Sequence, residues 1–195
     1  MRRRASLRIA LVAVLVTASG AALAEAPITP PPVPFDFQPP AGLRPFFVGH
    51  AVGTQNYVCL PAGASYGWSL FGPQATLFND RGEQVATHYL SANPDEAGTP
   101  RATWQHSKDT SAVWAQAAAI LTDAAYVEPG AIPWLLLRVV GDENGPGGGT
   151  KLSSATYLHR VNTSGGLVPD TGCSTPTDLG ARAFVPYSAD YYFYR

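Results

Sequence analysis

Four histidines are the side chains best suited to acid–base or metal chemistry: His50, His88, His106 and His159. His88 falls in an expected strand, and His106 has Asp109 three residues further on. Imidazole and carboxylate groups could bind a divalent metal together if the strands bring them side by side. The chain contains neither H-x-H nor H-E-x-x-H spacing, so hydrogen-bonded structural histidines are the alternative. We expect no metal and no cofactor.

Other catalytic patterns are missing from the chain. A serine nucleophile needs a base and oxyanion donors in fixed geometry, and the G-x-S-x-G signature is absent. Most acidic residues fall in expected loops, so no pair can be assigned to glycoside cleavage. The glycine-rich stretch 145–151 is not a phosphate loop, because Thr150 precedes Lys151 instead of following it. Whether the chain is an enzyme stays open, and a non-enzymatic role is favoured.

Aromatic residues are abundant, with four tryptophans and nine tyrosines. Exposed rings on a β-sheet can stack on sugars or other flat ligands. Trp68 and Trp104 are the candidates for such contacts, together with His88 and His106. Packing in the core is the alternative for any of these rings, and Trp134 lies in an apolar run that indicates the core.

The two cysteines, Cys59 and Cys173, predict one disulfide if the protein is exported. The bond would close a loop of more than 100 residues, which in the chain-entropy model stabilises the fold by about 4–5 kcal/mol. A pair of catalytic thiols is the alternative. No C-x-x-C motif is present and no histidine lies close in sequence to either cysteine, so the structural bridge is favoured.

The N-terminus has the three parts of a secretory signal peptide. Four arginines lie within the first eight residues, an uncharged apolar stretch follows over 9–16, and Ala22-Leu23-Ala24 forms an A-x-A cleavage pattern. The apolar stretch is shorter than the roughly 20 residues that a membrane-spanning helix needs. We therefore predict a signal peptide over 1–24, with cleavage after Ala24, and a secreted or periplasmic protein without a transmembrane segment.

Charge argues against nucleic acid as a partner. Removing the 24 leader residues from the 195 leaves 171, with nine basic and fourteen acidic side chains and a net charge of −5. A nucleic-acid binder needs a basic patch that neutralises phosphates. An anionic membrane surface is disfavoured for the same reason. A length of 171 residues suits one domain with a sizeable core.

Beyond the leader, composition divides the chain into an extended segment and a β domain. Residues 25–45 contain eight prolines, which predicts an extended, partly polyproline II segment. Residues 46–195 alternate short apolar runs with turn residues, which is typical of an antiparallel β-sandwich or partly closed barrel. The alanine-rich stretch from Ser111 to Ala125 could be helix, but its neighbourhood favours strand. Strands are expected over 54–60, 67–71, 75–78, 83–90, 102–106, 132–140, 155–161 and 191–194, with a hairpin turn over 79–82.

Several short strings occur in an order that resembles the secreted family called domain of unknown function 3455, over about residues 46–195. They include GTQNYVC (53–59), WSLFGPQA (68–75), THY (87–89), IPWLLL (132–137), RVNTSGG (160–166) and VPYSADYYFY (185–194). The resemblance implies a compact secreted β domain with its two cysteines paired. It implies no activity.

Together these observations favour a secreted, non-enzymatic binding or structural module. Its partner could be a carbohydrate or a component of the cell envelope. The alternative is an extracytoplasmic enzyme, metal-assisted, that uses His88 with His106 or Asp109.

Overall fold

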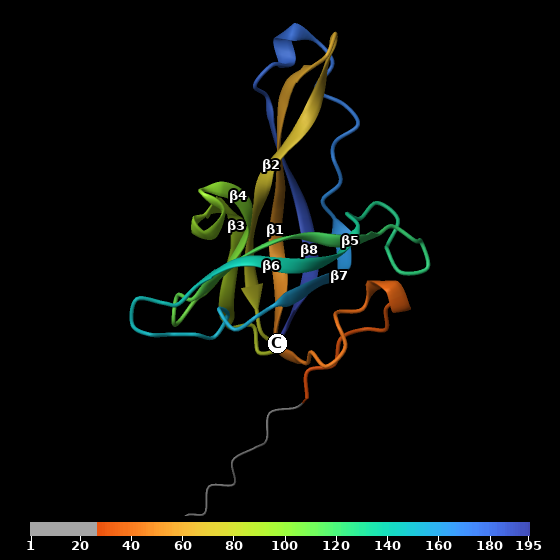
Figure 1. Cartoon of the computed structure of the whole chain (residues 1–195). Helices are drawn as coiled ribbons and strands as arrows, with labels where there is room; N and C mark the ends of the chain where they lie inside the picture. The colour runs from red at the N-terminus through yellow and green to blue at the C-terminus, as the bar shows by residue number, and fades with distance from the viewer. Residues whose placement is uncertain (1–26) are drawn as a thin grey trace, which may run out of the picture.

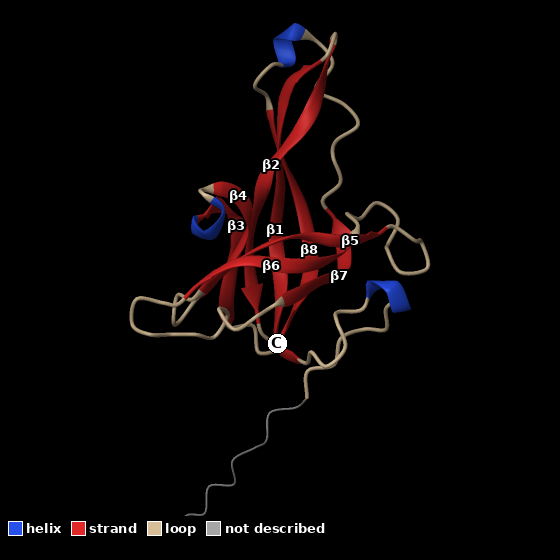
Figure 2. Ribbon diagram, in the orientation of Figure 1, coloured by secondary structure: helices blue, strands red, loops and turns tan. Residues whose placement is uncertain are grey.

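The computed structural model describes residues 27–195, which form an eight-stranded antiparallel barrel (Figures 1 and 2). Each strand pairs with the next along the chain, and the last closes the barrel against the first. Apart from three short 3-10 helices, Phe35–Phe37, Pro94–Glu96 and Pro176–Asp178, the described residues contain no helix. The strands are β1 Pro45–Ala62, β2 Ser65–Phe78, β3 Gln84–Asn93, β4 Thr99–His106, β5 Ala112–Leu121, β6 Trp134–Glu143, β7 Tyr157–Gly165 and β8 Arg182–Tyr194.

The all-β antiparallel prediction is therefore confirmed, and the barrel is fully closed. The predicted leader, 1–24, lies outside the described residues. Within residues 27–195, no helix is long and apolar enough to cross a membrane.

Along each strand, side chains alternate between the inner and the outer face of the barrel wall. Successive side chains of a strand point to opposite faces. On β8, Tyr191 and Phe193 belong to the core inside the barrel, while Tyr192 and Tyr194 belong to a second apolar cluster. Leu77 and Phe193 of the inner core are fully buried.

The second apolar cluster joins the proline-rich segment to the outside of the barrel. Phe37 is buried, and its ring stacks on that of His159 at 5.2 Å between centroids. The Nε2 atom of His159 lies 2.8 Å from the Phe37 carbonyl oxygen. Leu136 of β6 packs in this outer cluster and Leu137 in the inner core, so β6 is covered on both faces, as its near-continuous apolar run predicted.

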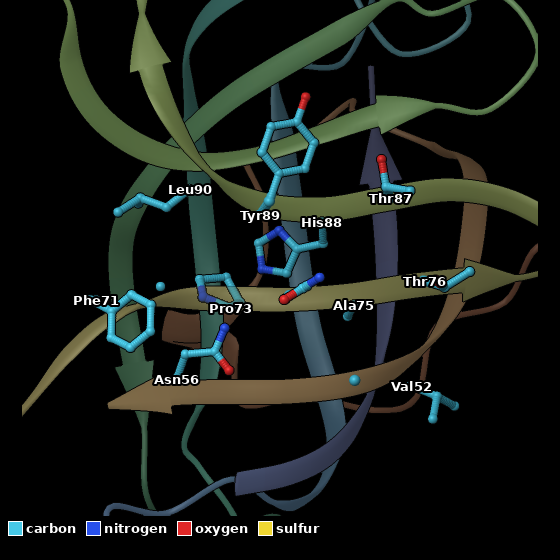
Figure 3. Close-up of a pocket in the computed structure, with 13 residues that line it drawn as sticks. Val52, Asn56, Phe71, Pro73, Ala75, Thr76, Thr87, His88, Tyr89 and Leu90 are labelled. Carbon is cyan, nitrogen blue, oxygen red and sulfur yellow. The ribbon is translucent and has the colours of Figure 1, made fainter. Parts of the chain in front are cut away.

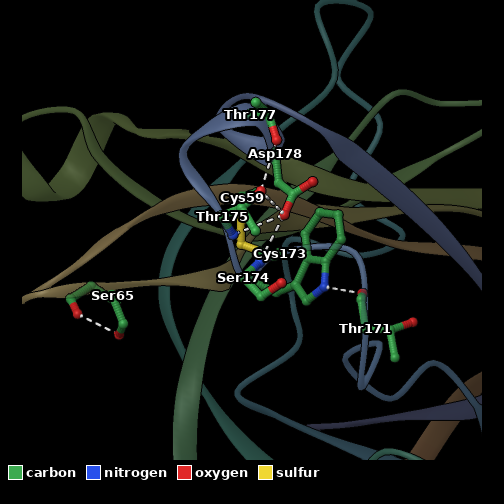
Figure 4. Close-up of a disulfide and its surroundings, with 10 residues drawn as sticks. Cys59, Ser65, Thr171, Cys173, Ser174, Thr175, Thr177 and Asp178 are labelled. Carbon is green, nitrogen blue, oxygen red and sulfur yellow. Dashed lines mark hydrogen bonds between the residues drawn. A yellow bond between two sulfur atoms is a disulfide. The ribbon is translucent and has the colours of Figure 1, made fainter.

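Three strands extend beyond the barrel wall: β1, β2 and β8. The β1–β2 hairpin protrudes at the top of Figure 1, and β8 accompanies it as far as the Val58–Arg182 pair. The predicted disulfide is confirmed: Cys59 on β1 is bonded to Cys173 in the loop before β8, with the Cα atoms 5.4 Å apart (Figure 4). The bond thus fixes the 166–181 loop against the extension.

Two strand boundaries predicted from prolines and glycines are wrong. The expected strands 67–71 and 75–78 are one strand, because β2 runs through Gly72-Pro73. Pro73 is opposite Gln55 of β1 but has no β3 neighbour, since β2–β3 pairing is confined to Ala75–Phe78. An edge position tolerates the missing N–H of proline.

Two other local predictions agree with the structure. The hairpin turn over 79–82 is present, and the Asn79 Oδ1 atom accepts hydrogen bonds from the backbone N–H groups of Arg81 and Glu83. The ambiguous alanine-rich stretch forms strand β5 from Ala112 to Leu121. Ala115 and Ala117 of β5 have small side chains, which leave space beside them inside the barrel.

Candidate functional site

A pocket of about 250 Å³ occupies the barrel interior at the end nearer the extension. Inward-facing side chains from all eight strands line it, so closure of the barrel is what creates it. Its walls are mainly apolar, with Leu135 and Leu137 from β6 and the small Ala115 from β5. We call this space the lumen pocket.

The lumen pocket meets the outside through the wall between β2 and β3. These strands pair only from Ala75–His88 to Phe78–Gln84, and beyond that point they diverge. An outer cleft of about 710 Å³ lies at this divergence (Figure 3). The cleft and the lumen pocket share Phe71, Gly72, Pro73, His88 and Leu90 in their linings. These five residues therefore form the boundary between cleft and lumen.

A β-bulge in β2 shapes that boundary. The β1–β2 register shifts between Asn56 and Tyr57, whose partners are Gly72 and Leu70, so Phe71 is the extra residue. Gly72 has a φ of +141°, and a Cβ atom there would lie 2.8 Å from the Leu90 Cβ atom. Bulges bend a strand locally and end its pairing. Glycine is required at this point of the opening.

His88 is held neutral in the wall. Its Nδ1 atom lies 2.9 Å from the Thr103 carbonyl oxygen, so Nδ1–H donates and Nε2 keeps an acceptor lone pair. The ring stacks on Trp104 at 4.1 Å between centroids. Burial, opposed by the Thr103 hydrogen bond and reinforced by the positive charge of Arg160, lowers the pKa of His88 to about 3.

Two buried hydrogen-bond donors in the pocket lining have no partner among the described residues. These are the Gln55 Nε2 and Trp104 Nε1 atoms, in side chains that are 3% and 1% exposed. Buried polar atoms without partners are few in native proteins, and each one calls for an explanation. A ligand with hydrogen-bond acceptors would satisfy both donors.

Arg160 brings a positive charge to the same lining. Its Nε and Nη2 atoms donate to the Pro133 carbonyl oxygen at 3.2 and 2.7 Å. Within residues 27–195, no carboxylate forms an ion pair with this guanidinium. Tyr191 also lines the pocket, and burial raises the pKa of its hydroxyl against the opposing charge of Arg160 and hydrogen bonds with Tyr187 and Arg160, so that the hydroxyl stays protonated. Gln55, Trp104 and Arg160 thus bring hydrogen-bond donors to the lining of the lumen pocket.

The structure brings together two of the four predicted ligand-binding residues. His88 and Trp104 face each other across β3 and β4 and line the lumen pocket. His106 lies two residues nearer the β2–β3 turn, where its Nδ1 atom is 2.9 Å from the Asp109 Oδ1 atom. Trp68 stands on the extension beside Cys59, and its indole N–H donates to the Thr171 carbonyl oxygen (Figure 4).

Metal-ligating groups are dispersed over the part of the chain that the structure describes. No group of three or more histidine, cysteine, aspartate and glutamate side chains there is arranged to hold a metal ion. The Asp109 carboxylate accepts hydrogen bonds from the Ser111 hydroxyl at 2.7 Å and from the Lys151 N–H at 2.8 Å. These bonds join the β4–β5 loop to the β6–β7 loop.

Sequence reasoning missed Gln55, Arg160 and Tyr191. Arg160 and Tyr191 lie two residues from the core positions Leu158 and Phe193, and Gln55 is itself buried on β1. Polar residues at inward positions of predicted strands were the available signal. Their convergence depends on barrel closure, which no local motif encodes.

The fold and the pocket define a class: a disulfide-bonded β-barrel with a small, donor-lined lumen, consistent with an extracytoplasmic domain. The family described as "Protein of unknown function (DUF3455)" matches residues 39–195. The chain belongs to this family, as the resemblance of its sequence strings predicted. No curated protein and no solved structure matches the chain.

Proposed function

We propose that the protein is an exported, non-enzymatic binding module that holds one small, mostly apolar molecule inside its barrel. The observation that carries this proposal is the lumen pocket itself, whose mainly apolar walls open to the outer cleft between β2 and β3. Ligand sites are typically concave, mainly apolar and supplied with a few polar groups that orient the ligand. The lumen pocket has each of these properties.

Export is supported by the covalent chemistry of the chain. Disulfides form and persist in oxidising compartments outside the cytoplasm. The Cys59–Cys173 bond therefore fits the secretory signal proposed for residues 1–24. N-terminal sequencing of the protein recovered outside the cytoplasm is expected to begin at Glu25, and recovery of the uncleaved chain there would contradict it.

Of the two partner classes that the sequence suggested, the pocket favours an apolar cell-envelope component over a carbohydrate. A sugar needs an exposed aromatic face and many polar partners. Trp104 is 1% exposed and stacks on His88, and the pocket walls are largely aliphatic. A compact apolar molecule matches those walls better.

Native mass spectrometry of protein purified from the extracytoplasmic fraction of its source tests the proposal. We expect a bound small molecule in the wild type that disappears in Ala115→Leu, because the larger side chain fills the lumen. Ala118→Leu is the matched control, since Ala118 is exposed on the same strand and lies outside the pocket lining. Equal amounts of bound molecule in the wild type and Ala115→Leu would contradict the proposal, as would an empty wild type.

A further inference from the structure

We infer that the lumen pocket selects a small organic monocarboxylate, with its carboxylate against Gln55, Trp104 and Arg160 and its apolar body against β6. This inference rests on the proposed function, because it names the ligand class of the same pocket. Two buried donors in the pocket lining have no hydrogen-bond partner among the described residues.

The two unpartnered donors require an acceptor. Gln55 on β1 and Trp104 on β4 are both more than nine-tenths buried, and both line the pocket. An indole N–H can only donate, so a second donor cannot satisfy Trp104 Nε1. A carboxylate is an acceptor-only group with two oxygens, which matches two donors in one site.

Arg160 makes an anion preferable to a neutral acceptor. Two of its nitrogen atoms are held by the Pro133 carbonyl oxygen, which fixes the plane of the guanidinium at the pocket. Among the described residues, no carboxylate neutralises its charge through an ion pair. A guanidinium matches the geometry of a carboxylate and binds it more strongly than it binds a neutral oxygen.

No negatively charged side chain faces these donors in the lining. The titratable residues of the pocket are His88, Arg160 and Tyr191. His88 is neutral and Tyr191 is protonated, so Arg160 alone carries charge. The field in the lumen is therefore positive.

Pocket size and walls define the rest of the ligand. A cavity of about 150 Å³ accommodates benzene. The 250 Å³ of the lumen therefore suffices for one ring or short chain with a carboxylate. Leu135 and Leu137 supply apolar surface for that body.

Benzoate and benzamide are suitable probes, because they share shape and differ in charge. Titration is followed by ¹H–¹⁵N NMR of the indole N–H signals, with the Trp104 signal assigned from Trp104→Phe. In the wild type we expect benzoate to bind at least about tenfold more tightly than benzamide and to shift the Trp104 signal. Hydrogen bonds to charged groups are stronger than hydrogen bonds to neutral groups, and the difference in free energy corresponds to about that ratio of affinities.

Variants assign the preference to individual side chains. Arg160→Met is expected to bring the two affinities within about threefold, because the charge is lost. Gln55→Met, which is similar in shape, is expected to weaken the binding of benzoate more than the binding of benzamide. This variant keeps the inference testable if Arg160→Met does not fold. Arg138→Met, which removes an exposed arginine from β6 outside the pocket lining, is the control and should behave as wild type.

The outcomes separate the inference from the proposed function. Equal affinities for benzoate and benzamide, with the Trp104 signal shifted by both, would leave a binding lumen and overturn the carboxylate preference. Unchanged preference in both Arg160→Met and Gln55→Met would also overturn it. A wild type that binds neither probe, with no shift at Trp104, would count against the proposed function itself.

Discussion

At the scale of single residues, His88 can stack on Trp104 inside the barrel wall because its imidazole is neutral. The ring contacts those of Trp104 and Tyr191, at 4.1 and 5.1 Å between centroids. A charged imidazole in this place would lose its hydration without gaining a carboxylate. The same side chain therefore makes the fold sensitive to acid.

The pH dependence of stability should carry the signature of His88. Its pKa is about 3 when folded and about 6.5 when unfolded, so between those values the unfolded chain binds more protons and stability falls as pH falls. The slope from this group approaches about 1.4 kcal/mol per pH unit. Urea unfolding at pH 7.5 to 4.5 should show a shallower loss in His88→Phe. A parallel loss in both proteins would contradict the assignment.

His50 should act in the opposite direction. Burial disfavours its charge, but hydrogen bonds to Asp190 at 2.6 Å and Asp80 at 2.9 Å outweigh burial and raise its pKa above 6.5. Its stabilising effect is therefore complete below pH 6.5 and lost as pH rises through the raised pKa. The difference in melting temperature between wild type and His50→Asn should shrink from pH 5.5 to pH 8.5. A difference that grows over this range would refute the assignment.

At the scale of elements, the opening depends on how β2 leaves β3. The bulge at Phe71, the positive φ of Gly72 and the unpaired edge before Ala75 occur together, and each contributes to the divergence. Because β-bulges re-aim side chains at barrel rims, a single residue in β2 can set access to the lumen.

Gly72→Ala tests that dependence. The new methyl group would press on Leu90 in a backbone conformation that L-residues rarely adopt, which costs roughly 1–3 kcal/mol. We expect lower stability and weaker binding of benzoate. Gly82→Ala is the control: its φ is +73° but nothing lies within 4 Å, so it should lose stability without losing binding. Unchanged binding by Gly72→Ala would show that the bulge does not control the opening.

The elements also show where sequence patterns succeed. Turn chemistry at Asn79 and the aromatic run at 191–194 are local properties, and both predicted their elements, although β8 begins nine residues earlier, at Arg182. Gly72-Pro73 predicts a strand end from local sequence alone and does not form one, because the effect of a proline depends on whether a neighbouring strand needs its N–H. That neighbour is set by tertiary pairing, which the local sequence does not specify.

At the scale of the whole molecule, closure creates the lumen and the disulfide secures the extension above it. Cys59 and Cys173 are separated by 114 residues, so the bond constrains most of the barrel. Pairing of the only two cysteines was predictable from their number. The shared pocket of Gln55 and Arg160 was not, since these residues belong to the first and seventh strands and share no motif.

Removing the disulfide should destabilise the whole barrel cooperatively. For Cys59→Ser combined with Cys173→Ser we expect a loss of roughly 4 kcal/mol in the free energy of unfolding, from the entropy of a long loop. Urea titration measures it, and reduced wild type should match the double variant. A double variant as stable as the oxidised wild type would contradict this view of the extension.

A crystal structure of the protein with 4-iodobenzoate tests the central claim most directly, because the anomalous signal of iodine locates the probe without reference to the surrounding side chains. We predict one iodine peak inside the barrel, with the carboxylate within hydrogen-bond distance of Gln55, Trp104 and Arg160. Iodine found only on the outer surface, with the lumen filled by water or by rearranged side chains, would contradict the account.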